Sequence, residues 1–473
     1  MPVEHWDRLY KNAYDNGVNR IRSIPGVCCA FHSVIDGLIH LHPDLLAPLL
    51  GKNASLKEAA LTGCRGEVPM EIYSPEDFIQ GLFYSLSKGC AMQRMIRTRE
   101  THQWVLETFG PGEHRLGGTA GNMARSLAPL DIPVTVYANP LTVELADLFG
   151  DYPNLRVIAR KNDGFTKIPP REAAKDEGIF AIHWIFEYTP DFVMNIDGVR
   201  VQPHRANRYI PSWNPINNQF RMSVEFAQGF LALIESYSHL LFSGFHILSE
   251  RYPDCSTCVD VVKPLSDYLG VVRERSSHLK IHLELASIAS PMIRRAVSRD
   301  IIPHVHSIGL NETELPLFLK PIDPYSDIEL GDDSDAMDYC RALAMIFRKT
   351  PVERIHFHNL GYYLCMEREP WSSPEASRDA LLFASTMAAA RAQNGLFSRL
   401  EDVAQGLHPS IDQSGLNQLK ALAERLGQPR LLETGIGRFE DYHLFMIPTR
   451  LVKNPMFTVG LGDTISSGAF LTA

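Results

Sequence analysis

The sequence predicts an α/β protein with a large domain, whose mostly parallel central sheet lies between helices, and a smaller β-rich domain. Two observations lead to this prediction. From about residue 230 onward, short apolar runs alternate with stretches of helical pattern, which is typical of a parallel sheet covered on both faces. Between residues 178 and 211, extended segments follow one another with few helices between them.

Short apolar runs predict the strands of the large domain. Strands are expected at residues 27–31, 240–244, 279–285, 304–308, 354–358 and 456–459. Helices are expected at residues 334–349 and 374–394. The second helix has Pro374 in its first turn and Gly395 just past its end, which are the usual places for these residue types.

Extended segments at residues 178–188, 192–202 and 207–211 predict the smaller domain. The dipeptide Asp197-Gly198 within them is a hairpin signal. Residues 38–75 are expected to add strands, so that a small sheet covers the large domain as a lid. The predicted domains are then residues 1–37, 76–177 and 221–473 for the large domain, and residues 38–75 and 178–220 for the lid.

Composition and charge exclude several classes of function. The chain of 473 residues has a formal net charge of −9, so it lacks the basic excess that nonspecific binding to nucleic acid or to a membrane surface requires. It has no apolar stretch of about 18 residues and no signal-peptide pattern at its start, which predicts a cytoplasmic protein. Its eight cysteines are expected to be reduced thiols.

The C-terminal segment carries the sharpest chemical signal. A predicted strand leads into Gly460-Leu461-Gly462-Asp463 and then into a helix. Glycines let backbone N–H groups approach a phosphate, and a carboxylate in the first helical turn can deprotonate an attacking hydroxyl. Phosphoryl transfer is therefore one interpretation, with Asp463 as base and Gly460 and Gly462 in an anion hole. Taken alone, these residues are explained equally well by a glycine turn with an ordinary capping Asp.

Acidic residues near the ends of two predicted strands indicate a metal site. Glu284 is the last residue but one of one predicted strand, and Asn311, Glu312 and Glu314 follow the next. Strand ends of an open α/β sheet face the crevice where ligands bind. Glu284, Glu312, Glu314 and Asp463 are therefore expected to hold Mg²⁺, directly or through water. Taken singly, each carboxylate is better explained by a helix start or a core hydrogen bond.

Further polar residues are candidates for substrate binding. Gly117, Gly118 and Thr119 form a glycine turn that enters a helix and can present backbone amides to a hydroxyl or a phosphate. Close packing of helix on sheet explains these glycines equally well. Asp36 follows a predicted strand and suits sugar hydroxyls, and Arg208 in the lid suits phosphate. A turn residue and a solvated surface charge are the respective alternatives.

A histidine pair, His356 and His358, has the spacing of metal ligands but lacks a third ligand of matching spacing. It is interpreted as structural or, with Tyr362 and Tyr363, as part of a nucleotide pocket.

The order of these segments resembles one family, the ADP-dependent glucokinases and phosphofructokinases of the ribokinase-like superfamily. The resemblance covers essentially the full chain. Its segments are the strand ending in Asp36 and residues 117–121, 185–188, 205–210, 243–245, 281–286, 307–314, 354–363 and 459–464. Each segment is weak alone, whereas all of them in the same order are specific.

The resemblance implies a ribokinase-like fold whose lid closes on sugar and nucleotide, and transfer of the β-phosphoryl group of ADP to a sugar hydroxyl with release of AMP. It makes Asp463 the catalytic base, and Glu284 and Glu314 the residues that organise Mg²⁺ through water. The implied substrate-binding positions are Asp36, Gly117, Gly118, Thr119, Gln93 and Arg208. The implied nucleotide-binding positions are Asn311, His356, Tyr362, Leu461 and Arg205.

Four positions depart from the family pattern. Val34 and Thr119 stand where the family usually has amide side chains, and Ala181 stands where some phosphofructokinases have a lysine for the sugar phosphate. Gln93 stands where glucose-phosphorylating members carry Glu. A neutral amide accepts less strongly from a sugar hydroxyl than a carboxylate does, which favours a phosphorylated acceptor such as fructose 6-phosphate.

Three functional hypotheses stay open at this point. The first is an ADP-dependent kinase of a hexose phosphate, with glucose or another sugar or polyol as the alternative acceptor. The second keeps the fold but takes ATP as the donor. The third is a catalytically weak relative that binds sugar or nucleotide. Val34, Thr119 and Gln93 motivate this third hypothesis, and the intact Asp463 segment opposes it.

Overall fold

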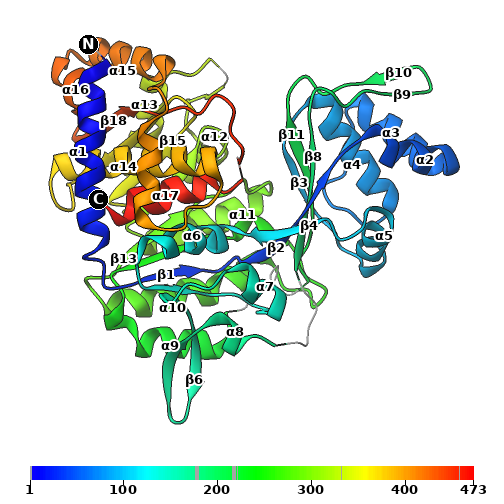
Figure 1. Ribbon diagram of the computed structural model, residues 1–473, viewed down its shortest axis with the longest axis horizontal. Helices are drawn as coiled ribbons and strands as arrows, with labels where there is room; N and C mark the ends of the chain where they lie inside the picture. Colours follow the sequence, from blue (N-terminus) through cyan, green and yellow to red (C-terminus); the bar gives the residue numbers. More distant parts are fainter. Residues whose placement is uncertain (1–2, 176–180, 216–219, 221, 332, 458) are drawn as a thin grey trace.

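A computed structural model describes residues 3–175, 181–215, 220, 222–331, 333–457 and 459–473 of the chain. Its strands form an 11-stranded sheet, a 5-stranded sheet and a 2-stranded ribbon. The two larger sheets lie in separate lobes that several chain segments connect (Figure 1).

The large sheet has the strand order β17-β18-β16-β15-β14-β13-β12-β1-β5-β6-β7. Its strands are β1 (Val27–Ala30), β5 (Val134–Val136), β6 (Leu155–Lys161), β7 (Gly164–Ile168), β12 (His239–Phe242), β13 (Lys280–Glu284), β14 (Ser307–Asn311), β15 (Arg354–His358), β16 (Tyr362–Glu367), β17 (Ile436–Phe439) and β18 (Tyr442–Pro448). Neighbouring strands are parallel from β15 across to β6 and antiparallel at both edges. The predicted mostly parallel sheet is confirmed.

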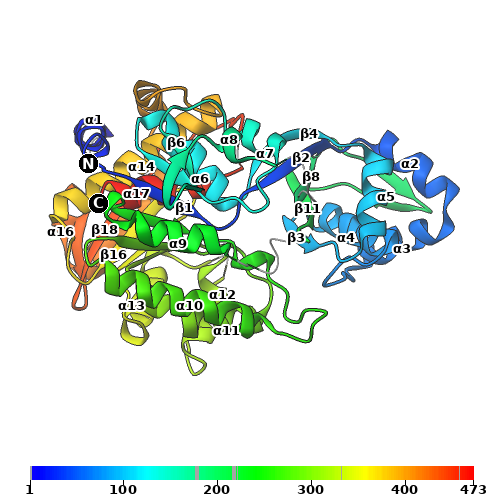
Figure 2. The same ribbon diagram turned by 90° about the horizontal axis from the view of Figure 1, so that it is seen from below.

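Helices cover both faces of this sheet, because a parallel sheet must bury both. The helices of the large lobe are α1 (Val3–Ile21), α6 (Thr119–Leu127), α7 (Val143–Leu148), α8 (Pro170–Ala173), α9 (Val224–Ala232), α10 (Cys258–Arg275), α11 (Pro291–Ala296), α12 (Leu315–Ile322), α13 (Ala336–Lys349), α14 (Pro374–Asn394), α15 (Gln413–Leu426), α16 (Pro429–Thr434) and α17 (Leu461–Leu471). Helices α1, α6, α14 and α17 lie on one face, and α10, α11, α12 and α13 lie on the other (Figure 2).

Helix α14 begins and ends where its sequence predicts. Ser373 accepts a hydrogen bond from the N–H of Ala376 and so caps the N-terminus, Pro374 occupies the first turn, and Gly395 follows the last residue with φ 85°. Nearly all of its side chains are buried, so α14 is an internal helix that packs against α1 on one side and α17 on the other.

The small lobe consists of the five-stranded sheet and the helices on one of its faces. Its sheet order is β3-β11-β8-β2-β4. Its elements are β2 (Val34–His40), α2 (Pro43–Lys52), α3 (Ala54–Arg65), α4 (Pro75–Lys88), β3 (Met92–Met95), α5 (Arg99–Phe109), β4 (Glu113–Gly117), β8 (Ile182–Tyr188) and β11 (Asn207–Trp213), with the ribbon β9 (Met194–Ile196) and β10 (Val199–Val201) at its far end. The predicted hairpin at Asp197-Gly198 is confirmed as the turn of this ribbon.

Residues 38–75 correct the prediction, because most of them form helices α2 and α3 instead of strands. Asn53 accepts hydrogen bonds from the N–H groups of Ser55 and Leu56 and caps α3, and Gly66 ends it with φ 102°. Residues 92–117, which were assigned to the large domain, supply two strands of the small sheet. The first residues of the predicted strand 178–188 lie outside the described part of the chain.

Two further strand predictions need correction. Asp36 lies inside β2 of the small sheet, since the chain leaves β1, crosses between the lobes and becomes extended again. The described residues among 456–459 form no strand. Pro455 precedes this segment and cannot donate to a ladder, and the N–H of Met456 donates instead to the carbonyl of Ala392 at the end of α14.

No helix in the described part of the chain combines the length and the apolar character that a membrane-spanning segment needs.

Candidate active site

One face of the five-stranded sheet carries a row of polar side chains. Asp36 pairs with Arg115 on β4 and with His183 on β8. Side chains alternate along a strand, and cross-strand partners lie on the same side of a sheet. The register therefore places Arg208 on β11 and Gln93 on β3 on the same face as Asp36. The opposite face carries the apolar side chains that pack on α4 and α5. The polar face is therefore the one left for a ligand.

Helix α17 begins at the opposite wall of the site. Gly460 caps it with φ 73°, and Asp463 lies in its first turn. A Cβ at Gly460 would lie 2.6 Å from Nη2 of Arg391 and 2.9 Å from Cγ of Asn122. Glycine is therefore required here both by the backbone conformation and by the lack of space. The side chain of Asn122 in α6 hydrogen-bonds to Asp463.

Four carboxyl groups from different elements influence one another in this crevice. Burial raises the pKa of Asp463 to about 6, that of Asp36 to about 7 and that of Glu314 to about 8, and it raises the pKa of Glu284 well above its usual value. The negative charge of Asp463 contributes to the raised pKa of each of the other three. The charge of Asp463 in the last helix therefore acts on the glutamates at the ends of β13 and β14.

Glu284 is held in a tight buried setting at the end of β13. It is 4% exposed, and its Oε2 lies 3.2 Å from Nε2 of His282, whose Nδ1 lies 2.9 Å from Oγ of Ser307. A Cβ at Gly309 on β14 would lie 2.0 Å from Oε2 of Glu284. The position of this carboxylate therefore depends on a glycine in the next strand.

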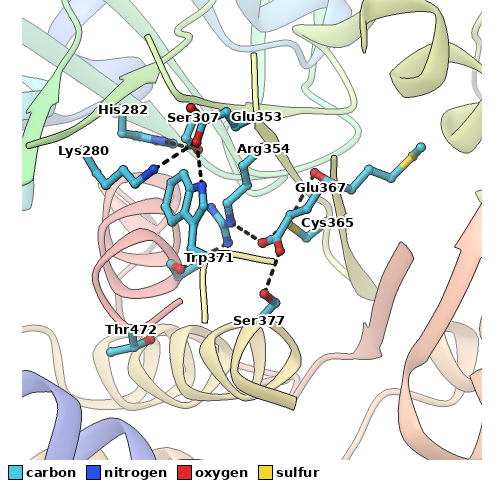
Figure 3. A network of polar contacts seen from close by, with 12 residues as sticks. Lys280, His282, Ser307, Glu353, Arg354, Cys365, Glu367, Trp371, Ser377 and Thr472 are labelled. Atoms are coloured by element: carbon cyan, nitrogen blue, oxygen red, sulfur yellow. Dashed lines mark hydrogen bonds and ion pairs between the residues drawn. The ribbon is translucent and has the colours of Figure 1, made fainter. Parts of the chain in front are cut away.

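A buried ion pair anchors the far end of α17 to the sheet (Figure 3). Nε of Arg354 on β15 donates to Glu367 on β16 at 3.0 Å, and Nη2 donates to the carbonyl of Ala469 at 3.1 Å. Ser377 of α14 donates to the second oxygen of Glu367 at 2.7 Å. Both charged side chains are fully buried, so these hydrogen bonds fix α17, and with it Asp463, against β15 and α14.

Asn311 and Glu314 cap each other at the end of β14. The N–H of Asn311 donates to Oε2 of Glu314, and the N–H of Glu314 donates to Oδ1 of Asn311, both at 3.0 Å. Strand β14 runs through Asn311, three residues later than the sequence prediction placed its end. Glu312 is exposed as a residue, but partial burial of its carboxyl group raises its pKa, and its charge contributes to the raised pKa of Glu314.

Two cavities open along the junction of the lobes. One of about 490 Å³ is lined by Asp36, Asn122 and Arg391 among others. The other, of about 830 Å³, is lined by Gln93 together with Asn214. The polar face of the small sheet therefore borders open space on both the β4 side and the β3 side.

The acidic cluster fits a cation that is held through water. Among the described residues, no group of three or more His, Cys, Asp or Glu side chains could hold a metal ion by itself. Burial nevertheless brings Glu284, Glu314 and Asp463 within mutual electrostatic influence, and a nearby cation would offset this repulsion. These residues fit a hydrated Mg²⁺ better than one bound by all of them directly.

Two residues expected at the nucleotide are buried inside the large sheet, and a third is held in the small lobe. His356 is fully buried within β15 and Tyr362 is buried in β16, so neither presents a free surface in this conformation. It is His358 that approaches α17, since its Nε2 would lie 3.2 Å from a Cβ at Gly462. Arg205 is exposed and donates to the carbonyl of Gly89 at 2.8 Å in the small lobe.

The remaining expected residues lie at the crevice. Gly118 is the N-cap of α6 and the N–H of Ala120 donates to the carbonyl of His32 at 2.9 Å. A Cβ at Gly117 would lie 2.0 Å from Oδ1 of Asp36, so this glycine lets Asp36 lie flat against β4. Leu461 is the first residue of α17.

Four residues of the site were missed by the sequence analysis: Asn122, Arg391, His183 and Arg115. Arg391 had a signal, because it interrupts an alanine run inside a helical pattern. A charged residue in such a run is buried with a partner or functional. His183 and Arg115 had no such signal in the sequence, since their proximity to Asp36 depends on the pairing of distant strands.

Comparisons with known proteins agree with this arrangement. A family model described as the ADP-specific Phosphofructokinase/Glucokinase conserved region matches residues 25–472. The ADP-specific phosphofructokinase of Methanosarcina acetivorans is 30% identical, with 100% of this chain and 97% of the relative covered. The ADP-dependent glucose/glucosamine kinase of Pyrococcus abyssi is also 30% identical, with 99% of this chain and 98% of the relative covered.

Two solved structures are similar over the whole chain. The last common ancestor of ADP-dependent phosphofructokinases from Methanosarcinales has a TM-score of 0.84 at 30% identity, with 100% of this chain and 98% of that chain covered. An ADP-dependent kinase in complex with fructose-6-phosphate and ADPβS has a TM-score of 0.86 at 29% identity, with the same coverage.

Proposed function

Because the chain belongs to the ADP-dependent phosphofructokinase and glucokinase family and is therefore a kinase of sugar hydroxyls, we propose that it transfers the β-phosphoryl group of ADP to fructose 6-phosphate and releases AMP. The observation that carries the proposal is the convergence of Asp463, Asp36, Glu284 and Glu314 in one crevice. Phosphoryl transfer needs the group that binds the acceptor, the base and the residues that organise the cation close together around one reacting centre.

Asp463 is the proposed base. Its carboxylate accepts the proton of the attacking hydroxyl as the oxygen–phosphorus bond forms, and the bond between the β-phosphorus and its bridging oxygen breaks, leaving AMP. The backbone N–H groups of residues 460–462 lie at the N-terminus of α17, and in this proposal they stabilise the negative charge on the transferring group.

The acceptor is proposed to bind along the polar face of the small sheet. Asp36 accepts from its hydroxyl groups, with His183 Nδ1 3.8 Å from Oδ1 of Asp36 as a neighbour. Arg208 and Arg115 both lie near enough to lower the pKa of Asp36, and either guanidinium suits the phosphate of a sugar phosphate. Gln93 donates to Oγ of Ser212 at 2.9 Å, so this amide is already oriented beside the row.

Mg²⁺ is the proposed cofactor, organised through water by Glu284 and Glu314. When bound, it supplies neutralisation of the diphosphate charge. The two glutamates need only orient its water ligands, and each is itself fixed, Glu284 by His282 and Glu314 by Asn311.

Measurement of AMP release tests this proposal. Purified protein is incubated with ADP or ATP and with fructose 6-phosphate, glucose or glucosamine, each with and without Mg²⁺. We expect release of AMP from ADP with fructose 6-phosphate, and only in the presence of Mg²⁺. Turnover of ATP but not ADP, or no turnover with any acceptor, would contradict the proposal.

A glucokinase activity is the second candidate. It is favoured by the equal identity of the chain to a phosphofructokinase and to a glucose/glucosamine kinase. The two guanidinium groups near Asp36 favour the phosphorylated acceptor instead. A higher kcat/KM for glucose than for fructose 6-phosphate in the same assay would decide for the second candidate.

The raised pKa of Glu314 leads to a prediction about stability. Its pKa is about 8 in the folded protein, above its usual value, because the residue is buried. The stabilisation from its proton is therefore complete below about pH 4 and is lost as the pH rises through 8. Glu314→Gln mimics the protonated form. In the absence of ligands it should match the wild type at pH 5 and be more stable by at least about 2 kcal/mol at pH 9.

Urea unfolding at both pH values measures this difference. Glu67→Gln is the matched control, because Glu67 is exposed and its replacement should leave the pH dependence unchanged. A Glu314→Gln protein whose stability relative to the wild type does not change with pH would contradict the prediction.

A further inference from the structure

Arg391 lies directly behind the loop that leads into α17. It belongs to the last turn of α14 and is 6% exposed. Its Nη1 donates to Oγ of Ser126 and, at 2.7 Å, to Oγ1 of Thr464, and its Nη2 lies 3.3 Å from the carbonyl oxygen of Val459. One guanidinium thus joins three separate elements, α14, α6 and the Val459–Thr464 turn.

These hydrogen bonds leave the charge of Arg391 uncompensated by any direct ion pair. Its acceptors are two hydroxyls and a carbonyl, and in the described part of the chain no carboxylate lies within ion-pair distance of it. Burial accordingly lowers the pKa of Arg391 to about 10, and Asp463 is the acid that opposes this effect. A buried cation without a carboxylate partner is costly, so its retention calls for a compensating role.

The position of the charge indicates what that role is. Gly460 lies so close that a Cβ on it would be 2.6 Å from Nη2 of Arg391. The backbone of Gly460, which belongs to the proposed anion hole, is therefore close to the guanidinium group of Arg391. Arg391 also lines the cavity of about 490 Å³ beside Asp36. Arg125 also lowers the pKa of Arg391, and Asp463 in turn interacts with the acids Asp36, Glu284 and Glu314.

We infer that Arg391 is a positioning residue whose buried positive charge, placed behind residues 460–462, strengthens their hold on the transferring phosphoryl group. It acts through the loop and does not touch the substrate. Negative charge accumulates over the loop as the phosphoryl group moves, so a fixed cation behind it favours the transition state over bound ADP. This inference rests on the proposed function, because it assigns Arg391 a role in the same reaction.

The charge and the hydrogen bonds of Arg391 can be separated by substitution. Arg391→Gln removes the charge, Arg391→Lys keeps it, and Ser126→Ala removes one hydrogen-bond acceptor but leaves the charge in place. We expect Arg391→Gln to lower kcat by about 10²-fold with the KM for ADP changed less than about threefold. Arg391→Lys and Ser126→Ala should each stay within about tenfold of the wild-type kcat.

Chemical rescue provides a readout that a purely structural role would not produce. Arg391→Ala leaves space beside an existing cavity. Guanidinium ion at millimolar concentration should restore much of its kcat, whereas urea, which has the same planar shape without the charge, should not. Binding of AMP with aluminium fluoride and fructose 6-phosphate, measured by calorimetry, should weaken in Arg391→Gln by the factor lost in kcat.

The outcomes distinguish a failure of the proposed function from a failure of this inference alone. Wild-type protein that releases no AMP with any acceptor overturns the proposed function and this inference together. An active wild type whose Arg391→Lys and Ser126→Ala variants lose as much kcat as Arg391→Gln overturns the inference alone, and so does equal rescue by guanidinium and urea. If Arg391→Gln does not fold, as judged by its melting curve, the comparison of Arg391→Ala with guanidinium and with urea decides.

Discussion

Asp463→Asn should abolish phosphoryl transfer while leaving ADP bound. An amide has the shape of the carboxylate and keeps the hydrogen bond to Asn122, but it cannot accept the proton of the attacking hydroxyl. The loss of a general base costs roughly 10²–10⁴-fold in rate, so kcat should fall by about 10³-fold. The Kd for ADP should stay the same or decrease slightly, because a negative charge that repels the diphosphate has been removed. AMP release and calorimetric titration with ADP measure these two effects.

The matched control is an Asp→Asn change far from the crevice. Asp197 lies in the turn of the β9–β10 ribbon with φ 49°, a conformation that Asn tolerates well, so Asp197→Asn should keep full activity. A variant of Asp463 that retains more than a few per cent of the wild-type kcat would end the assignment of Asp463 as base. Weaker ADP binding by Asp463→Asn would instead indicate that the substitution disturbs the backbone of residues 460–462.

The order of the elements in the large lobe could be predicted because each depends on local pattern. Helix α14 shows this, since Pro374, its apolar run and Gly395 are contiguous in sequence and their meaning does not depend on distant partners. Local signals for helix are also present in residues 43–65, namely Pro43, Asn53 and Gly66. The prediction of strands there is wrong because it groups this region with the extended segments at residues 178–211.

The geometry of the site depends on information that a single sequence does not carry. Asp36 was chosen as a residue past the end of a strand, yet it faces the crevice because β2 pairs with β8 and β4, whose sequences lie far away. The same pairing brings Arg115 and His183 to Asp36. Only the register of the sheet decides which alternate residues face the ligand, and register is fixed by the packing of the whole lobe.

That Asp463 and the glutamates lie near one another was predictable for a different reason, whereas their roles stay proposals. The carboxyl ends of parallel strands meet at one edge of a sheet, so Glu284 and Asn311 had to lie near each other once both strands were recognised. The segment before Gly460 was wrongly predicted as a strand. The functional consequence was small, because the position of Asp463 is set by α17 and its anchor at Arg354.

Gly309→Ala should impair the acidic site without altering any acidic residue. Gly309 pairs with Glu284 across β13 and β14, and its added Cβ would lie 2.0 Å from Oε2 of Glu284 and 3.0 Å from Nε2 of His282. Both side chains are buried and cannot give way freely. We expect a loss of about 1–3 kcal/mol in stability and a shift of roughly 10–100-fold in the Mg²⁺ concentration needed for AMP release. Thermal melting and Mg²⁺ titration measure these effects.

Gly51→Ala is the matched control for this change. A Cβ at Gly51 would meet nothing within 4 Å, and alanine suits the helix α2 in which it lies, so stability and Mg²⁺ dependence should be unchanged or slightly improved. The double variant Gly309→Ala/Glu284→Asp separates the two effects of Gly309→Ala. The shorter side chain makes room for the methyl group, so stability should recover, but the carboxylate is then withdrawn from the crevice and the Mg²⁺ requirement should stay high. Recovery of both would mean that Glu284 only fills space and does not organise the cation.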